Sequence, residues 1–218
     1  DIVPRARQGT LFIDCSTIDV ESARAAHKLA AERGIGTLDA PVSGGVGGAK
    51  AATLTFMVGG TDHAFKRGKP VLERMGKRIV HCGEAGNGQV AKICNNMILA
   101  ASMIALGEAF VMGEKLGLSH QALFDVASAS SGQCWALTSY CPVPGPVPAS
   151  PANNDYKPGF AASLMLKDLK LAREAAKSVK VKNAIGAHAA EIYEEFAQQG
   201  FGGSDFSGII NFIRTPSE

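Results

Sequence analysis

Three short segments of this 218-residue chain carry polar side chains suited to catalysis. The first is Gly83-x-x-Gly86-x-Gly88-x-x-x-Lys92-x-x-x-Asn96. Residues four apart lie on one face of an α-helix, so Gly88, Lys92 and Asn96 form a stripe. Lys92 can transfer a proton, and the Asn96 amide can donate to and accept from a small polar substrate. We expect a reaction surface here, with Gly88 letting a ligand approach the backbone.

The neighbours of Lys92 bear on its role. They are mostly apolar: Val90, Ala91, Ile93 and Cys94. Desolvation penalises the charged ammonium form of a lysine and favours the neutral amine, which can act as a general base. A lysine base also avoids the repulsion that a carboxylate base would suffer beside an anionic substrate. The alternative is a solvated lysine on an amphipathic helix.

The second segment is Asp39-Ala-Pro-Val-Ser-Gly-Gly45, in which a strand runs into small residues. Ligands of open parallel sheets bind beyond the carboxyl ends of the strands, where Ser43, Gly44 and Gly45 should lie. Adjacent amides and a hydroxyl form a neutral cradle for a carboxylate. The alternative is an ordinary glycine loop.

The third segment begins at Phe160 and includes Lys167-Asp168-Leu169-x-Leu171-Ala172. Lys167 and Asp168 interrupt a helix that is otherwise rich in Leu and Ala. They are either functional or a surface pair on a core helix.

One glycine motif is a false lead. Gly86-Asn-Gly88-Gln-Val-Ala91 follows a predicted strand and fits the dinucleotide fingerprint, with Glu108 about 20 residues later. The true fingerprint requires a second strand that ends at the acidic residue, whereas Glu108 falls in the middle of a predicted helix. We reject this motif as the phosphate-binding loop.

The elements that position these segments change in kind along the chain. Up to residue 85, strands predicted at 11–16, 36–41, 53–58 and 78–82 alternate with helices at 19–34 and from 62, with Pro70 expected to break or restart the latter. Such alternation predicts a mostly parallel sheet with helices on its faces.

From residue 86 onward the periodicity is helical. Helices are predicted at 86–118, 119–130, 161–179, 184–199 and 204–214, with a long loop at 131–159. The predicted fold is α/β followed by all-α. The predicted boundary lies near residue 85, so residues 1–85 form the region with the sheet, and residues 86–218 form a helical region that begins with a long helix.

Composition excludes several partners. The 22 basic and 20 acidic residues give a net charge of +2 without a basic run, so nucleic acid is not expected. Five cysteines without metal-ligand spacing favour a reducing compartment, and the histidines also lack ligand spacing, so no metal is expected. The longest apolar stretch, residues 97–106, is about half of the ~20 residues that span a bilayer, so no membrane partner is expected.

Together, the three segments resemble the β-hydroxyacid dehydrogenase family in order and spacing. Within that family, the chain is most similar to the 3-hydroxyisobutyrate dehydrogenases. The similar segments span nearly the whole chain: Asp14-Cys-Ser-Thr-Ile-Asp19, Leu54-Thr-Phe-Met-Val-Gly-Gly60, Ala91-Lys-Ile-Cys-Asn-Asn96, Pro142-Val-Pro-Gly145 and Ala152-Asn-Asn154.

The resemblance implies a role for each candidate residue. Lys92 would be the catalytic acid/base. The substrate-binding residues would be Ser43, Gly44, Gly45, Lys92, Asn96 and Asp168. The residues next to the cofactor would be Thr17, Phe160 and Lys167.

The resemblance also implies that residues 1–85 are the remainder of a Rossmann-like domain and that residues 86–218 are a helical substrate and oligomerisation domain. It implies NAD or NADP as cofactor and a homodimeric or homotetrameric assembly. It suggests the mitochondrial matrix in a eukaryote and the cytoplasm in a bacterium. Asp1 resembles a cut point, and the family's phosphate-binding segment is not among the 218 residues. We therefore expect this chain to be an incomplete catalyst by itself.

The predicted reaction is hydride transfer from 3-hydroxyisobutyrate to NAD(P), giving methylmalonate semialdehyde in valine degradation. One alternative is a tartronate or succinic semialdehyde reductase of the glyoxylate type, with the loop around Trp135 setting the choice. Another is a catalytically inactive fragment that serves as an oligomerisation or binding module.

Overall fold

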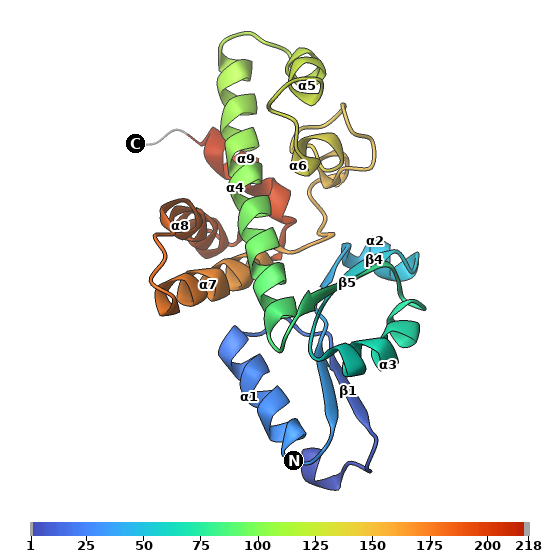
Figure 1. Cartoon of the computed structure of the whole chain (residues 1–218). Helices are drawn as coiled ribbons and strands as arrows, with labels where there is room; N and C mark the ends of the chain where they lie inside the picture. The colour runs from blue at the N-terminus through green and yellow to red at the C-terminus, as the bar shows by residue number, and fades with distance from the viewer. Residues whose placement is uncertain (1, 216–218) are drawn as a thin grey trace. The chain divides into compact units, whose positions relative to one another are not determined.

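The computed structural model describes residues 2–215, which fall into two compact units, Asp1–Asn95 and Asn96–Glu218. The division falls inside the longest helix, α4 (Asn87–Lys115), drawn in green in Figure 1. The domain boundary that the sequence predicts near residue 85 lies just before this helix begins, and it stays a prediction.

The first unit contains the sheet, and its strands are where the sequence predicts them. Parallel ladders join β1 (Leu11–Asp14) to β2 (Gly36–Asp39), and β4 (Leu54–Gly59) to β5 (Gly76–Gly83). The strand order is β1-β2-β4-β3, with β5 on β4. The expected mostly parallel sheet of an α/β fold is confirmed.

Antiparallel pairing is limited to the centre of the sheet. Asp39 pairs with Gly59, and the two-residue strand β3 (Val42–Ser43) runs against β4. The short helix α2 (Gly45–Lys50) follows directly. The expected glycine loop is thus a strand end and a helix start, joined through the positive φ angles of Gly44 (134°) and Gly45 (59°).

The two longer helices of this unit begin at side-chain caps. The Asp19 carboxylate accepts from the Ser22 amide at the start of α1 (Val20–Ala31). The Thr61 hydroxyl accepts from the Ala64 amide at the start of α3 (Asp62–Leu72). Side-chain oxygens at this position satisfy amides that have no partner inside the helix.

Pro70 does not break α3, so that prediction was wrong. Proline fixes φ near the helical value, and its cost in a helix is a lost amide and a crowded carbonyl one turn earlier. Pro70 is exposed and only two residues from the end of α3, so water can solvate that carbonyl. Leu72, at the end of the helix, packs in the core with Leu38, Phe56 and Val58.

The second unit is helical. It contains the later part of α4, with α5 (His120–Ser128), α7 (Ala162–Ser178) and α8 (Ala184–Gln198), all near their predicted positions. Its main core gathers side chains from α4, α7 and α8, among them Met103, Leu169 and Tyr193, each fully buried. Figure 1 shows α7 and α8 as adjacent helices of this unit.

Two predictions for this unit were wrong. The long loop is not structureless: it contains α6 (Trp135–Thr138) and the 3-10 helix η2 (Pro151–Asn154). The segment predicted as a helix at 204–214 is instead one 3-10 turn, η4 (Phe206–Gly208), and the shorter α9 (Ile209–Arg214). A further 3-10 turn, η3 (Phe201–Gly203), comes just before it. Asp205 prevents a regular start, because its side chain bonds to Ser207 in a tight turn.

By length and composition, α4 could cross a membrane, with a mean hydropathy of 1.5 over its most apolar 18 residues. Half of that window is buried inside the protein. Ala100, Met103 and Ile104 of α4 belong to the main core of the second unit. Packing inside the protein therefore explains the apolar character of this helix. The remaining 3-10 turn, η1 (Val3–Arg5), lies near the N-terminus.

Candidate active site

The carboxyl ends of β1 and β2 lie side by side, because Asp14 pairs in register with Asp39 in a parallel ladder. The loops at 15–19 and 40–45 therefore leave the same edge of the sheet, the edge at which open α/β folds bind their ligands. These loops carry Thr17 and Ser43. The first unit thus places a predicted cofactor residue and a predicted substrate residue on one sheet edge.

The Thr17 loop is held by a glutamine that the sequence reading missed. The Gln89 side chain is fully buried at the start of α4. Its Oε1 accepts from the Ile18 amide at 3.1 Å, and its Nε2 donates to the Ser16 carbonyl at 2.8 Å. Gln89 lies within the rejected fingerprint, and nothing in its sequence context indicated that its side chain reaches residues 16–18.

Cys15, in the same loop, has a raised thiol pKa, mainly because of burial and secondarily because of the Asp14 carboxylate. A raised pKa keeps the thiol protonated at neutral pH. Cys15 is therefore a poor nucleophile, and the chemistry of this edge depends on other residues.

The turn from β3 into α2 contains Ser43, Gly44 and Gly45, the residues expected to bind a carboxylate. Ser43 pairs with Thr55 in the β3–β4 ladder, and Gly44 and Gly45 are exposed at the turn into α2. A side chain on Gly44 would press against Leu54 at 3.1 Å, and its φ of 134° disfavours any other residue. The glycines are thus required by the turn itself, as the alternative interpretation held, and they also leave the backbone open.

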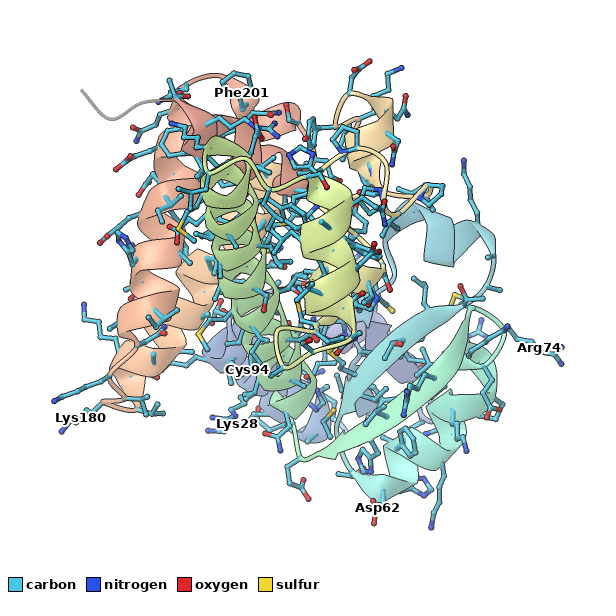
Figure 2. All side chains as sticks on the ribbon, turned by 90° about the horizontal axis from the view of Figure 1, so that it is seen from above. Lys28, Asp62, Arg74, Cys94, Lys180 and Phe201 are labelled. Carbon is cyan, nitrogen blue, oxygen red and sulfur yellow. The ribbon has the colours of Figure 1, made fainter. Side chains whose placement is uncertain are left out.

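Lys92 and Asn96 are buried, with 7% and 2% of their surface exposed. The alternative of a solvated lysine was therefore wrong. Cys94, which is labelled in Figure 2 and lies two residues along α4 from Lys92, is exposed, so these two side chains lie on different faces of the helix. Because α4 is continuous to Lys115, Glu108 is inside a helix, and the rejection of the dinucleotide fingerprint is confirmed.

Gly88 has a different purpose from the one predicted. A Cβ atom there would collide with the carbonyl oxygen of Met57, and would lie 2.6 Å from the Asp39 carbonyl oxygen and 2.7 Å from its carboxylate. The space that a side chain at Gly88 would take is occupied by Met57 and Asp39 of the sheet, and not by a ligand. The expectation that Gly88 opens the backbone to a substrate is corrected accordingly.

In the second unit, Asn96 of α4 and Asp168 of α7 form one buried pair. The Asn96 amide donates to Asp168 Oδ2 at 2.6 Å, and both residues are 2% exposed. Lys167 Nζ lies 3.4 Å from Oδ1 without hydrogen-bond geometry, and Oδ1 has no hydrogen-bond partner among the described residues. A buried carboxylate oxygen in this state can accept a hydrogen bond from a hydroxyl group of a ligand.

Phe160 is positioned by Asp205, a second residue that the sequence reading missed. Asp205 is fully buried, and its Oδ2 accepts from the Gly159 and Phe160 amides at 2.9 and 3.1 Å and from the Tyr140 hydroxyl at 2.8 Å. Burial, with a smaller effect of Asp205, raises the Tyr140 pKa far above its usual range. The phenol therefore remains a donor. The Phe160 ring packs edge-on against Phe206.

The predicted residues thus form two groups. The first unit holds Thr17, Ser43, Gly44, Gly45 and Lys92, and the second holds Asn96, Phe160, Lys167 and Asp168. Lys92 and Asn96 are one turn apart on the continuous α4. The two groups are joined in sequence through this helix.

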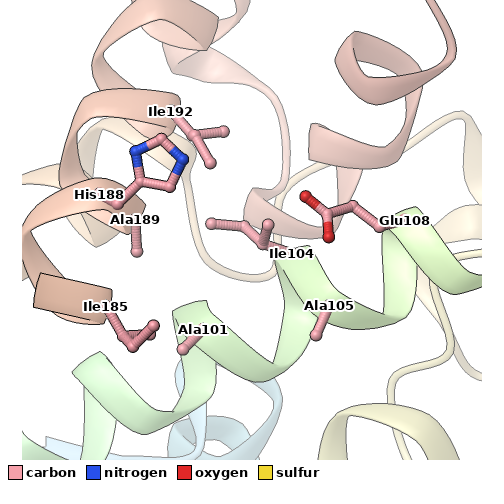
Figure 3. Close-up of a pocket in the computed structure, with 8 residues that line it drawn as sticks. All are labelled: Ala101, Ile104, Ala105, Glu108, Ile185, His188, Ala189 and Ile192. Carbon is pink, nitrogen blue, oxygen red and sulfur yellow. The ribbon is translucent and has the colours of Figure 1, made fainter.

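A cavity of about 200 Å³ in the second unit holds none of these residues. It lies between α4 and α8 and is lined mostly by Ala and Ile side chains, with Glu108 and His188 as its polar members (Figure 3). Among residues 2–215, no group of three or more His, Cys, Asp or Glu side chains could hold a metal ion.

Comparison with known proteins supplies the family. The family model described as the NAD-binding domain of NADP-dependent 3-hydroxyisobutyrate dehydrogenase matches residues 86–213, which is more than half of the chain. The chain belongs to the 3-hydroxyisobutyrate dehydrogenase family. A second model, the NAD-binding domain of 6-phosphogluconate dehydrogenase, matches residues 1–83.

Relatives in this 3-hydroxyisobutyrate dehydrogenase family cover the whole chain. A protein of Mycobacterium tuberculosis named as a probable 3-hydroxyisobutyrate dehydrogenase is 55% identical over 218 residues, all of this chain and 74% of that protein. The mitochondrial 3-hydroxyisobutyrate dehydrogenase of Mus musculus is 43% identical over 98% of this chain and 64% of its own length. The NAD-dependent L-serine dehydrogenase of Pseudomonas aeruginosa is 48% identical over 96% of this chain and 70% of its own length.

Solved structures agree with the fold. The Mycobacterium tuberculosis 3-hydroxyisobutyrate dehydrogenase in complex with L-serine has a TM-score of 0.94 and 56% identity, over 98% of this chain and 73% of that one. The chain is therefore an NAD-dependent dehydrogenase of the hydroxyacid type, with a mostly parallel sheet followed by helices.

Proposed function

We propose that this chain catalyses the oxidation of 3-hydroxyisobutyrate to methylmalonate semialdehyde with NAD(P), the reaction of valine degradation. The observation that carries the proposal is the 55% identity to the mycobacterial relative along the entire chain. In this oxidation the alcohol substrate loses a hydride from its carbinol carbon and a proton from its hydroxyl group. The protein must accept that proton, and the bound nicotinamide supplies the hydride acceptor.

Lys92 is the proposed general base in oxidation and general acid in reduction. Its side chain is buried and not solvated at the surface, which supports this role. Its place on α4 one turn before Asn96 puts a hydrogen-bonding amide at the spacing expected for one small substrate.

The substrate is proposed to bind through its carboxylate and its hydroxyl group. Ser43, Gly44 and Gly45 would hold the carboxylate by hydroxyl and amide donors. Asn96 would bind the hydroxyl group, and Asp168 would hold Asn96 in place through the 2.6 Å hydrogen bond. Asp168 Oδ1 has no hydrogen-bond partner among the described residues and lies 3.4 Å from Lys167 Nζ, so it offers one further acceptor.

The cofactor is proposed to contact Thr17 in the first unit and Phe160 and Lys167 in the second. A nicotinamide fits the first unit, because the Thr17 loop leaves the carboxyl edge of a parallel β-α-β unit and is fixed there by Gln89. We further propose residues 1–85 as part of a Rossmann-like domain and 86–218 as a helical substrate and oligomerisation domain. The exposed side chains of Met112 and Ile185 on the helical unit support the latter.

L-serine is the second candidate substrate, favoured by two comparisons. A relative at 48% identity is named as an L-serine dehydrogenase, and the mycobacterial structure carries L-serine. Serine and 3-hydroxyisobutyrate share the carboxylate and the primary hydroxyl group, and differ only in an ammonium or a methyl group on the middle carbon. The residues proposed above act on the shared groups, so the same chemistry serves both.

The test is an assay of cofactor reduction with 3-hydroxyisobutyrate and with L-serine, using NAD and NADP. It is run on this chain and on this chain joined to the part of the mycobacterial relative that it does not cover. Lys92→Ala should lower kcat/KM by about 10²- to 10⁴-fold, because it removes the proton acceptor. Lys115→Ala, an exposed lysine at the end of the same helix, is the matched control and should leave kcat/KM unchanged.

Higher kcat/KM with 3-hydroxyisobutyrate than with L-serine supports the primary proposal, and the reverse order supports the serine alternative. Full activity of Lys92→Ala would contradict the role of Lys92. Turnover only with tartronate or succinic semialdehyde in the reverse direction would move the assignment to a semialdehyde reductase. Inactivity of both forms with all four compounds would favour a binding module.

A further inference from the structure

Asp39 caps the first turn of α4 from the neighbouring strand β2. Its Oδ1 accepts from the Gly86 amide at 2.8 Å and its Oδ2 from the Gln89 amide at 3.0 Å. Only 2% of Asp39 is exposed, and His27 Nε2 lies 3.0 Å from Oδ1. A carboxylate at a helix start satisfies amides that have no partner inside the helix and interacts favourably with the helix dipole. The start of α4 is therefore tied to the end of β2.

Two glycines make this attachment close. A Cβ atom on Gly88 would lie 2.6 Å from the Asp39 carbonyl oxygen, and one on Gly59 would lie 2.5 Å from Asp39 Oδ1. Backbone therefore lies directly against the carboxylate on both sides. Because packed interiors resist displacement, the first turn of α4 cannot shift along the sheet without losing these contacts.

The same turn reaches the loop on the other side. Gln89 accepts from the Ile18 amide and donates to the Ser16 carbonyl, which are the residues on either side of Thr17. The Gln89 backbone amide is one of the two that Asp39 holds. Gln89 thus links the first turn of α4 to the loop that carries Thr17.

We propose that Asp39 and Gln89 are positioning residues for the dehydrogenase reaction. Asp39 fixes the turn that leads, three residues after Gln89, to Lys92. Gln89 fixes the loop that presents Thr17 to the cofactor. This inference rests on the roles proposed above for Lys92 and Thr17. Neither Asp39 nor Gln89 needs to touch the reacting atoms.

Gln89→Leu tests the cofactor side, because leucine fills similar space without either hydrogen bond to the loop. We expect the KM for NAD(P) to rise about tenfold, the equivalent of about 1.4 kcal/mol for two lost hydrogen bonds. The kcat value should stay within about threefold, since Lys92 keeps its anchor. The measurement uses the active form of the chain identified by the assay above.

Asp39→Asn and Asp39→Ala test the Lys92 side. Asparagine keeps one acceptor oxygen and alanine keeps none, so kcat should fall in that order, by about tenfold and about 100-fold, with a smaller change in the cofactor KM. Thr61→Ala is the matched control, because it removes a helix cap from α3 in the same unit. Thr61→Ala should lower the melting temperature and leave kcat and KM unchanged.

Equal kcat losses in Thr61→Ala and Asp39→Asn would overturn the inference, because a general loss of stability would then explain both. An unchanged cofactor KM in Gln89→Leu would also overturn it. Hydrogen exchange gives a readout without turnover: the Gly86 and Gln89 amides should be protected in the parent chain and lose protection in Asp39→Ala.

The failure of this inference is distinguishable from the failure of the proposed function. If Lys92→Ala is inactive while the Asp39 and Gln89 variants have parental kinetics, the function stands and the positioning roles fall. If the parent protein turns over neither 3-hydroxyisobutyrate nor L-serine, the proposed function is wrong. If Lys92→Ala is fully active, only the proposed role of Lys92 is wrong, and the Lys92 half of the inference is wrong with it. The proposal that Gln89 positions the Thr17 loop is then tested by the dissociation constant of NAD, measured directly on Gln89→Leu and expected to rise.

Discussion

Replacing Asp205 by alanine should destabilise the second unit more than any exposed substitution. The Asp205 carboxylate is fully buried and accepts five hydrogen bonds: from the Tyr140 hydroxyl, the Gly159 and Phe160 amides, and both the amide and the hydroxyl of Ser207. The distances range from 2.7 to 3.1 Å. These bonds connect α6, the turn before α7 and the start of η4.

The magnitude follows from the donors left behind. A hydrogen bond to a charged group contributes about 1.5–3 kcal/mol, but dehydration of the carboxylate offsets part of the sum, and some of the released donors will find water. We therefore expect Asp205→Ala to lower the free energy of unfolding by about 4 kcal/mol. Asp205→Asn should cost about 2 kcal/mol, since its amide nitrogen faces other donors, and Tyr140→Phe about 1 kcal/mol.

Urea unfolding followed by tryptophan fluorescence measures these changes. Trp135 is the only tryptophan, and its ring stacks on Tyr140 with centroids 5.3 Å apart. Its emission therefore reports the unfolding of the segment that Asp205 holds. The free energy is obtained by linear extrapolation to zero urea. Asp125→Ala, an exposed aspartate on α5 of the same unit, is the control and should cost less than about 0.5 kcal/mol.

Two results would refute this reasoning. An Asp205→Ala cost no larger than that of Asp125→Ala would show that the buried network contributes no net stability. A Tyr140→Phe cost equal to that of Asp205→Ala would show that one hydrogen bond, and not the carboxylate with its five donors, holds the segment.

Two further predictions concern ionisation and packing. Burial raises the pKa of Tyr140, Tyr156 and Tyr193, which are all the tyrosines of the chain. The stability that these neutral phenols contribute is therefore complete below the usual pKa of 10.0 and is lost as the pH rises above it. Tyrosinate absorbance should therefore appear only together with unfolding, and its appearance near pH 10 with circular dichroism intact would contradict the assignment. Gly88→Ala should strongly lower the melting temperature or prevent folding, because its Cβ atom would collide with backbone oxygens. Gly113→Ala on the same helix is the control, since its Cβ atom would make only contacts of 3.5 Å and beyond. It should be neutral or stabilise the protein by up to about 1 kcal/mol. Equal melting temperatures for the two variants would show that the close contact at Gly88 is not rigid.

Local patterns in the sequence determined most of the elements. Strand and helix periods, the caps at Asp19 and Thr61, and the change of character after residue 85 are all set by residues near one another in the chain. The errors occurred where a local rule competes with context. Pro70 is tolerated because it is exposed near a helix end, and the 204–214 segment is irregular because a buried aspartate forms a turn inside it.

The candidate site residues were also predicted from the sequence, since the motif order around Ser43, Lys92 and Lys167 is a property of the chain itself. Only the tertiary structure decided how these residues are held. Asp39 with Gln89, and Asp205 with Tyr140, are paired across 50 and 65 positions of sequence. No local pattern encodes such pairs, because a buried carboxylate needs donors that only the folded backbone brings to it.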